Sequence, residues 1–429
     1  MSTTYSDTQV MMTLAAFAAT GATERPSSEP LKEHTARIGH GITALLKMKE
    51  LATGGAWTLK WVGQTASRAN LAYIAQGPDN GSGPVYALVL RGTVGGSPID
   101  TAEDMQVGLM LPFLGGAAGN ISQGAMQAFT DIVMGTGLIQ ALQECSPILT
   151  LYVVGHSLGG AMATTMSLYI ANTGIVDYTN IYPYTFAAPT AGDQAFATAF
   201  NSQFSWAVCV INAYDLVPNA WQTLASMPAN SGNGQQLYYP GLFSSPKGPG
   251  PTMEKHNAIG LVISSIADGT NGNLYVQPTQ QQPWLNVSDV PVLQWAYPAN
   301  LTSMQEFEVQ VGFQHANTTY LALLGAPSPT AKAPVVASIS PPIGVAGTPV
   351  TITPPVGMIF EPGSVVDFGI VAVPCTVADD GSSISVVAPP GVGTVDIRVT
   401  NKFGTSPAVP VYPNLTMDSF SDQFTYQGY

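Results

Sequence analysis

A serine between two glycines is the first residue in this chain whose setting suggests chemistry. The stretch GHSLG, residues 155–159, follows the pattern G-x-S-x-G. With 44 glycines among 429 residues, two glycines flank a given serine in this way about once in a hundred by chance, so the pattern alone is weak. However, β-branched residues precede it from Ile148, and a helical run rich in alanine and methionine follows it. Such a strand-to-helix turn exposes a serine hydroxyl above a sheet and places a helix N-terminus behind it, so Ser157 is predicted to be a nucleophile.

Asp215 is the carboxylate best placed to assist that serine. A serine hydroxyl is a weak nucleophile at neutral pH, so it needs a base and an acid that orients the base. Asp215 ends the valine- and isoleucine-rich run VCVINAYD, and open α/β sheets place their sites at the carboxyl ends of such strands. A turn-capping role is its alternative, and Asp193, Glu103 and Asp104 are weaker candidates for the acid.

Five histidines could supply the base, and three of them are placed unfavourably. His156 lies inside the glycine-flanked stretch, where its side chain is expected to point away from that of Ser157. His34 and His40 precede the strands, and their spacing does not suit a metal site on one helix face. The sequence therefore predicts neither a metal site nor a cofactor.

The other two histidines, His256 and His315, both follow Asp215 in the chain. One large class of serine hydrolases has the chain order serine, acid, histidine, and either residue satisfies it. Both also precede apolar helical runs. The residues themselves leave this choice open.

The elements that must position these residues alternate between strand-like and helix-like segments from about residue 58 to 215. Helical stretches are expected near 122–143 and 158–172. The expected strands are short and rich in valine, isoleucine, tyrosine and tryptophan: WTLKWVGQT, NLAYIAQ, PVYALVLRGT, ILTLYVVGHS, NIYPYTFAAPT and WAVCVINAYD. This alternation predicts an α/β fold with a sheet that is parallel in its central part.

Two breaks in composition divide the rest of the chain. Residues 227–300 are rich in glycine, proline, glutamine and asparagine, and are interpreted as an insertion in a first domain, 1–326. A linker at 327–333 follows. Residues 334–429 alternate valine-rich strands with turns, which predicts a small all-β sandwich. From SISPPIGVAGTPVTI, GTVDIRVTN and DQFTY, this tail resembles the IPT/TIG immunoglobulin-like domains, which are often accessory or interaction modules.

The N-terminal apolar run from Val10 to Ala19 has two interpretations. It lacks the preceding basic residues of a signal peptide, and a packed amphipathic helix is the favoured interpretation. The apolar positions that fit one helix face are Val10, Met11, Leu14, Ala15 and Phe17.

Composition excludes some functions. Only 9% of residues are charged and the net charge is −13, so nucleic acid is not an expected partner. The three cysteines have no metal-type spacing. No apolar run approaches the roughly 18 residues that a membrane-spanning helix needs.

The motifs together resemble the class 3 lipases, fungal-type triacylglycerol lipases with the α/β-hydrolase fold. The resemblance spans most of residues 58–325 and rests on VLRGT, ISQGAMQAF, VVGHSLGGAMA, YTFAAPTAGDQAFA, VINAYDLVPNAW and QHANTTYLALL. Thr190 and Ala191 stand where the family commonly has an Arg-Val pair, which indicates a divergent, bacterial branch.

The resemblance implies a carboxylic ester hydrolase with Ser157 as nucleophile, Asp215 as acid and an oxyanion hole formed by Thr93 and the backbone N–H of Leu158. It favours His315 as the base, because a tyrosine and a helix follow that histidine, and His256 becomes the alternative base. The implied substrate is a small-molecule ester or a lipid, with a lipid interface as a further expected partner. The oligomeric state stays open.

Three further expectations concern the setting of this site. The apolar segment 107–116, VGLMLPFLGG, is either a hinged lid over an acyl pocket or a packed loop at the sheet edge. A secreted or cell-surface location is expected, with the cytoplasm as alternative. The rival function is a surface interaction protein, in which the hydrolase domain is an inactive scaffold and the β-sandwich binds a partner.

Overall fold

A computed structural model describes fifteen stretches of the chain, which form two compact units. One unit is Met1–Ala18 with Trp57–Pro327, and the other is Ala19–Ala56 with Ser328–Tyr429. The sequence did not indicate that Ala19–Ala56 groups with the C-terminal unit. The described residues are 5–20, 30–67, 69–92, 106–212, 215–221, 265–266, 268–278, 284–285, 311–312, 314–328, 334–354, 358–369, 371–401, 404–406 and 422–427.

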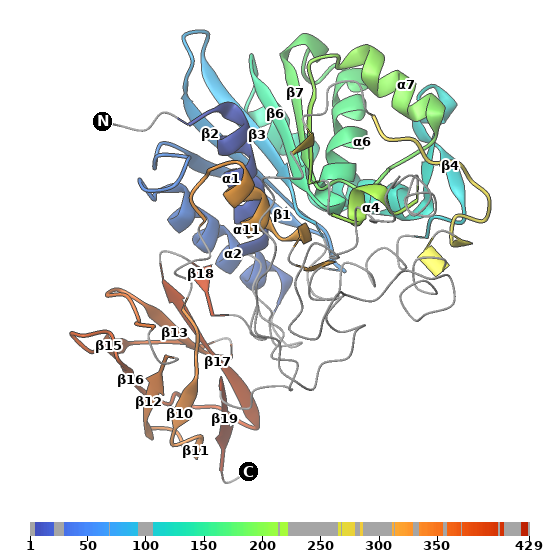
Figure 1. Ribbon diagram of the computed structural model, residues 1–429. Coiled ribbons are helices and arrows are strands. Elements are labelled where there is room, and N and C mark those ends of the chain that lie inside the picture. The colour runs from blue at the N-terminus through green and yellow to red at the C-terminus, as the bar shows by residue number, and fades with distance from the viewer. Residues whose placement is uncertain are drawn as a thin grey trace, which may run out of the picture. The chain divides into compact units, whose positions relative to one another are not determined.

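A seven-stranded sheet forms the centre of the first unit (Figure 1). Its first three strands in spatial order are antiparallel, and the remaining ones are parallel. This confirms the predicted α/β architecture. The order is β1 (Thr58–Gln64), β2 (Leu71–Asp79), β3 (Pro84–Leu90), β6 (Leu151–His156), β7 (Ile181–Phe186), β8 (Val208–Asn212) and β9 (Trp284–Leu285).

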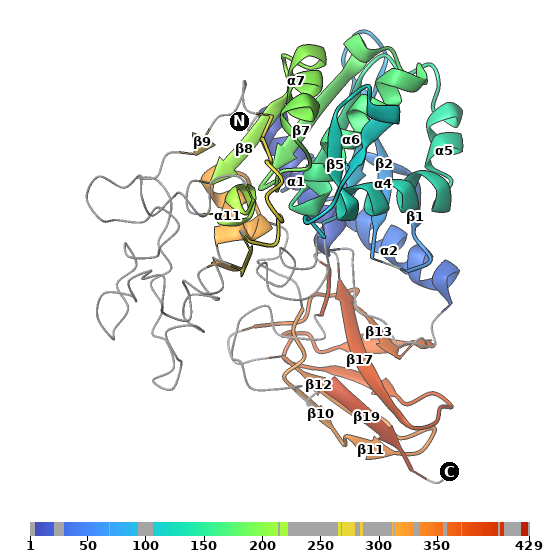
Figure 2. The ribbon, with the colours of Figure 1, turned by 90° about the vertical axis from the view of Figure 1, so that its right-hand side faces the viewer.

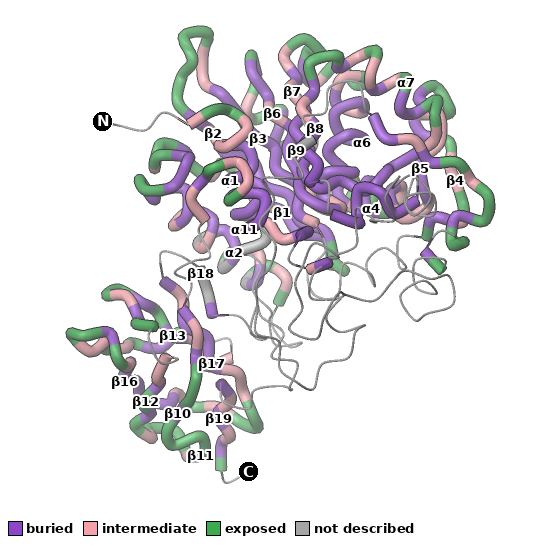
Figure 3. The backbone as a smooth tube through the Cα atoms, in the orientation of Figure 1, coloured by how far each residue is buried: buried purple, intermediate pink, exposed green. Residues whose placement is uncertain are grey.

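Helices cover both faces of this sheet (Figure 2). One face shares an apolar core with α4 (Gln123–Gly135), α5 (Leu138–Glu144), α6 (Leu158–Thr173) and α7 (Gln194–Gln203). Figure 3 shows β3, β6 and α6 buried along most of their length. The glycine- and alanine-rich start of α6 lets this helix approach the sheet closely, as the next section describes.

The N-terminal helix α1 (Asp7–Thr20) and the short helix α11 (Asn317–Leu323) lie side by side on the first unit (Figures 1 and 2). The Gln9 side-chain amide donates to Leu324 O at 2.8 Å, at the end of α11. Tyr73 OH of β2 donates to Leu14 O at 2.6 Å. Residues 11–18 of α1 are all buried, which confirms the predicted packed helix, although the burial extends beyond the one apolar face that the sequence indicated.

The segment 107–116 is packed in this structure. Its strand β4 (Met110–Pro112) pairs with β5 (Asn120–Ser122), and the 3₁₀ turn η1 (Phe113–Gly116) follows. The ring of Phe113 is buried against Phe129 and Phe196. In this conformation the segment packs against the first unit. Within the part that the structure describes, no helix is long and apolar enough to span a membrane.

The predicted insertion, residues 227–300, lies largely outside the described residues. Its described parts belong to the first unit. Strand β9 extends the parallel sheet beside β8, and Tyr275 OH donates to Val107 O at 2.7 Å.

The second unit contains helix α2 (Leu31–Leu46) and two β-sheets. The two sheets share one apolar core, in agreement with the β-rich tail predicted from the sequence. Ile352 and Val386 contribute from one sheet, and Val366, Ile397 and Phe424 contribute from the other. The first sheet has the order β10 (Ser338–Ser340), β12 (Pro349–Thr353), β16 (Ile384–Val387) and β15 (Cys375–Val377). The second is β11 (Ile343–Gly344), β19 (Gln423–Tyr426), β17 (Thr394–Asn401), β13 (Val365–Phe368) and β14 (Val371–Val373), with β18 (Gly404–Thr405) paired to β17.

Candidate active site

Ser157 occupies a sharp turn between β6 and α6. Its backbone has φ 60° and ψ −133°, a left-handed conformation that a side chain rarely adopts. Strain of this kind costs about 1–3 kcal/mol and persists only where the surroundings enforce it. Here the backbone N–H of Ser157 donates to Phe186 O on β7 at 2.9 Å, and α6 begins at the next residue.

Three glycines around the serine are required by close packing. A Cβ at Gly155 would lie 2.0 Å from Gly159 O, and a Cβ at Gly159 would lie 2.1 Å from Leu90 O on β3. A Cβ at Gly160 would lie 2.7 Å from the Cβ of Ala188. These distances are too short for any side chain, so the glycine pattern follows from the close approach of α6 to the sheet.

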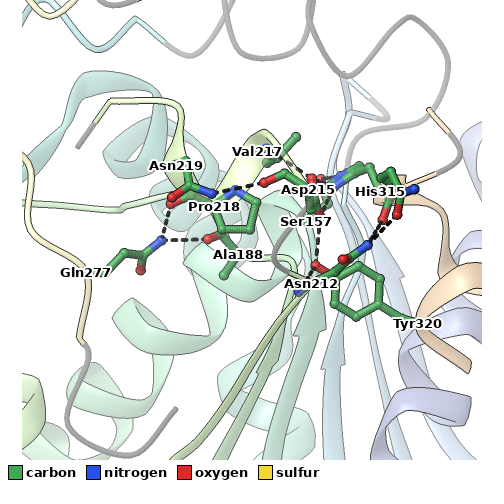
Figure 4. A network of polar contacts seen from close by, with 11 residues as sticks. Ser157, Ala188, Asn212, Asp215, Val217, Pro218, Asn219, Gln277, His315 and Tyr320 are labelled. Atoms are coloured by element: carbon green, nitrogen blue, oxygen red, sulfur yellow. Dashed lines mark hydrogen bonds and ion pairs between the residues drawn. The ribbon is translucent and has the colours of Figure 1, made fainter. Parts of the chain in front are cut away.

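His315 and Asp215 lie next to Ser157 in a continuous chain of contacts (Figure 4). The Nε2 atom of His315 is 2.8 Å from Ser157 Oγ. The Nδ1 atom is 2.9 Å from Asp215 Oδ2 and 3.1 Å from Oδ1. All three residues are buried. The structure thus brings together the three residues that sequence reasoning assigned as nucleophile, base and acid.

The Asp215 carboxylate accepts further hydrogen bonds from neutral donors. The backbone N–H of Val217 donates to Oδ1 at 3.0 Å, and Tyr320 OH donates to Oδ2 at 2.8 Å. A fully buried carboxylate needs such donors, because a buried charge without hydrogen-bond partners is costly. The bond from Val217 is the turn-capping contact considered from sequence, so Asp215 caps its turn and orients His315 at once.

Three residues that sequence reasoning did not assign to the site complete this network. Tyr320, on α11, accepts from the backbone N–H of Asn212 at 3.0 Å while donating to Asp215. The side-chain amide of Asn212 donates to Gln314 Oε1 at 2.8 Å and to Gln314 O at 3.0 Å. Burial first, and then the negative charge of Asp215, raise the pKa of Tyr320 well above its usual value, so this phenol stays a donor.

The signals for these three residues were present but indirect. Tyr320 follows the histidine in the sequence pattern that favoured His315, and it was given no role. Asn212 lies within the predicted strand WAVCVINAYD and is the last residue of β8 in the structure, and Gln314 directly precedes His315. Nothing in their local sequence indicates that they contact one another.

The other residues considered for the site from the sequence lie at helix starts or outside the described residues. Thr93, His256, Glu103 and Asp104 lie outside the described residues. Leu158 is the first residue of α6. Asp193 is the N-cap of α7, where its carboxylate accepts from the backbone N–H of Phe196 at 2.9 Å, and it also binds Asn120.

The other histidines lie in different parts of the chain. His34 is buried on α2, and the side chain of His40 is outside the described residues. His156 is buried with its ring against that of His315. Among the described residues, no group of three or more histidine, cysteine or acidic side chains could hold a metal ion.

Comparison with known proteins relates this fold and site to lipases. The family model of class 3 lipases matches residues 87–224, which include part of β3, the turn at Ser157 and Asp215. The solved M37 lipase aligns with 75% of this chain and 93% of its own at a TM-score of 0.54 and 20% identity. Together these matches support a lipase-like α/β-hydrolase.

Two fungal lipases are also similar, more distantly. A Rhizomucor miehei lipase in complex with its propeptide covers 50% of this chain and 60% of its own, with a TM-score of 0.37 and 19% identity. Lipase II from Rhizopus niveus covers 49% of this chain and 74% of its own, with a TM-score of 0.36 and 17% identity. At these scores the two add no structural argument beyond the M37 match.

Proposed function

We propose that this protein is a serine hydrolase of carboxylic esters that forms an acyl-enzyme on Ser157. The observation that carries the proposal is the 2.8 Å contact between His315 Nε2 and Ser157 Oγ, in line with the contact between His315 Nδ1 and Asp215. A serine, a histidine and an aspartate in this order of contacts are the parts that acyl transfer requires. The class 3 lipase match over residues 87–224 supports the same class of reaction.

In the proposed mechanism, His315 moves one proton in each half of the reaction. It accepts the proton of Ser157 as Oγ attacks the ester carbonyl, and Asp215 stabilises the imidazolium that forms. The imidazolium then protonates the departing alcohol, which leaves an acyl ester on Ser157. Water then attacks this ester, with His315 again as the base that accepts its proton and passes it to Ser157 Oγ. The carboxylic acid is released and Ser157 is regenerated.

The proposed oxyanion hole uses the N-terminus of α6. Leu158 is the first residue of that helix, so its backbone N–H belongs to the turn whose N–H groups have no partner within the helix. Such donors, together with the positive end of the helix dipole, stabilise the negative oxygen of a tetrahedral intermediate. Thr93 is proposed as the second donor from sequence alone.

The experiment is the replacement Ser157→Ala, assayed on p-nitrophenyl esters and with a fluorophosphonate probe. Ester hydrolysis and labelling should both disappear. Ser167→Ala is the matched control, because Ser167 lies further along the same helix and its hydroxyl donates to Ala163 O of that helix. Full activity in the Ser157 variant would refute the proposal.

A profile of acyl-chain lengths, with and without emulsified lipid, separates the possible substrates. Preference for long chains with activation at an interface indicates a triacylglycerol lipase, which would fit the lipase matches. Preference for short soluble esters indicates a carboxylesterase, and polyester or aryl-ester cleavage is tested in the same series. If the folded protein does not react with the fluorophosphonate probe, the result favours the rival function, a surface interaction protein with the IPT/TIG-like tail as its binding module. The proposed location, secreted or cell-surface, is checked by fractionating the producing cells.

A further inference from the structure

His156 is a buried titratable residue beside the candidate triad that the proposed reaction does not use. It is the last residue of β6 and directly precedes Ser157. Its ring centroid lies 4.9 Å from that of His315, with the two planes inclined by 43°. It also lies 5.5 Å from the ring of Tyr320, in an edge-to-face arrangement at 83°. One imidazole therefore packs against both the proposed base and the phenol that bonds Asp215.

The surroundings of His156 keep its ring neutral. Its side chain is buried, and its Nε2 atom has no hydrogen-bond partner among the described residues. Burial lowers the pKa of the His156 imidazole well below its usual value, and the neighbouring His315 lowers it further. A hydrogen bond with the His315 main chain acts in the opposite direction and is the smaller effect. The ionisable groups around this ring are His315, Tyr320 and, behind them, Asp215.

We propose that His156 is a positioning residue, which holds the imidazole of His315 in line with Ser157 by packing against it as a neutral ring. This inference rests on the proposed serine-hydrolase function. It assigns no proton transfer to His156, and its effect on the reaction passes through His315.

The geometry of His315 explains why such support is needed. Its hydrogen bonds to Ser157 and Asp215 lie at opposite ends of the ring and define one line through it. Those bonds resist movement along that line, but they leave the ring free to tilt about it. Aromatic packing from the side opposes the tilt. A displacement of about 1 Å in a reacting group can lower a rate on the order of a hundredfold, so this restraint bears directly on turnover.

The neutrality of His156 matters in the proposed intermediate. His315 carries a positive charge after it has taken the proton of Ser157. A second positive charge with ring centroids 4.9 Å away would oppose that step, whereas a neutral ring does not. The burial of His156, whose Nε2 atom has no hydrogen-bond partner among the described residues, therefore suits the chemistry beside it.

The test compares His156→Leu, which removes the aromatic ring, with His156→Phe, which keeps a neutral ring. Values of kcat and KM for a soluble p-nitrophenyl ester, and the rate of fluorophosphonate labelling, are measured for both. We expect His156→Leu to lower kcat and the labelling rate about ten- to a hundredfold, with KM nearly unchanged. His156→Phe should restore most of that loss. His34→Leu is the matched control, because it removes a buried histidine from the other unit and should leave kcat unchanged.

Several outcomes would overturn the inference. A His156→Leu enzyme with normal kcat, or a Phe variant as slow as the Leu variant, removes the role of the ring. If His156→Leu does not fold, an NMR pH titration of the wild-type ring still decides, because a ring that gains its proton near pH 6.5 is not neutral support. Normal His156 variants together with an inactive Ser157→Ala would refute this inference alone, whereas an active Ser157→Ala would refute the proposed function itself.

Discussion

The Nε2 atom of His315 lies 2.8 Å from the Oγ atom of Ser157, although 158 residues separate them in the chain. Ser157 is presented by the turn between β6 and α6, whereas His315 lies two residues before α11, near the end of the first unit. Asp215, which follows β8, closes the arrangement from a third segment. The site therefore depends on the assembly of three distant pieces of chain around one sheet edge.

The choice between the two candidate bases is tested by His315→Ala and His256→Ala. In the proposed mechanism His315 carries both protons, so its removal should lower kcat by a factor on the order of a million, as losing the histidine of a serine triad does. His256→Ala should keep the wild-type kcat. Purified variants are compared by active-site titration and ester hydrolysis, and the reverse pattern would transfer the role to His256.

Tyr320→Phe should impair the enzyme without abolishing it. The change removes the donor to Asp215 Oδ2 and leaves the backbone N–H of Asn212 without the oxygen that now accepts from it. We expect the free energy of unfolding to fall by about 1–3 kcal/mol, and kcat to fall on the order of tenfold through a less firmly held Asp215.

Urea unfolding and steady-state kinetics measure the two effects of Tyr320→Phe. Tyr169→Phe is the control, because the Tyr169 ring packs against Phe129 and that packing is kept in the variant. Wild-type stability and kcat in Tyr320→Phe would show that the hydroxyl does not support the carboxylate.

Gly159→Ala should destabilise the protein far more than an alanine at another helical glycine. Its new Cβ would lie 2.1 Å from Leu90 O, so α6 would have to move away from β3. We expect the free energy of unfolding to fall by about 3 kcal/mol or more, because overpacking and backbone conflicts in a core are costly.

Gly135→Ala is the matched control for this prediction, because nothing lies within 4 Å of its added Cβ at the end of α4. That change should be neutral or stabilise the protein by up to about 1 kcal/mol. Thermal unfolding of both variants measures their Tm shifts relative to the wild type. Equal shifts would contradict the close approach of α6 to the sheet.

Stability should decline in alkaline solution through Tyr73. Burial raises the pKa of Tyr73 well above its usual value, and its hydroxyl donates to Leu14 O. The unfolded chain releases this proton at about pH 10, whereas the folded protein keeps it. The stabilisation from this proton is therefore complete below that pH and is lost as the pH rises above it.

Urea unfolding at a series of pH values between 8 and about 11 measures this decline. In Tyr73→Phe the decline should be shallower by up to about 1.4 kcal/mol per pH unit, since one proton fewer is linked to folding. The same substitution at Tyr178, which is exposed, is the control. An unchanged slope in Tyr73→Phe would contradict the prediction.

The sequence by itself determined the local features of this protein. The alternation of strands and helices, the turn around Ser157 and the strand that leads to Asp215 are readable because period, sterics and turn chemistry act over a few neighbouring residues. Gly155 shows this directly, since a Cβ added there would meet Gly159 O, four residues further along the chain.

Only the tertiary structure decided which histidine meets Ser157, how Tyr320, Asn212 and Gln314 hold Asp215, and that the ring of His156 lies against His315. The contacts that Asp215 makes with His315 and Tyr320 span 100 and 105 residues. The residues alone left His256 equally possible, and family resemblance, not spacing, favoured His315. Contacts of this range depend on how a whole sheet assembles, and no local pattern encodes the partner at the other end.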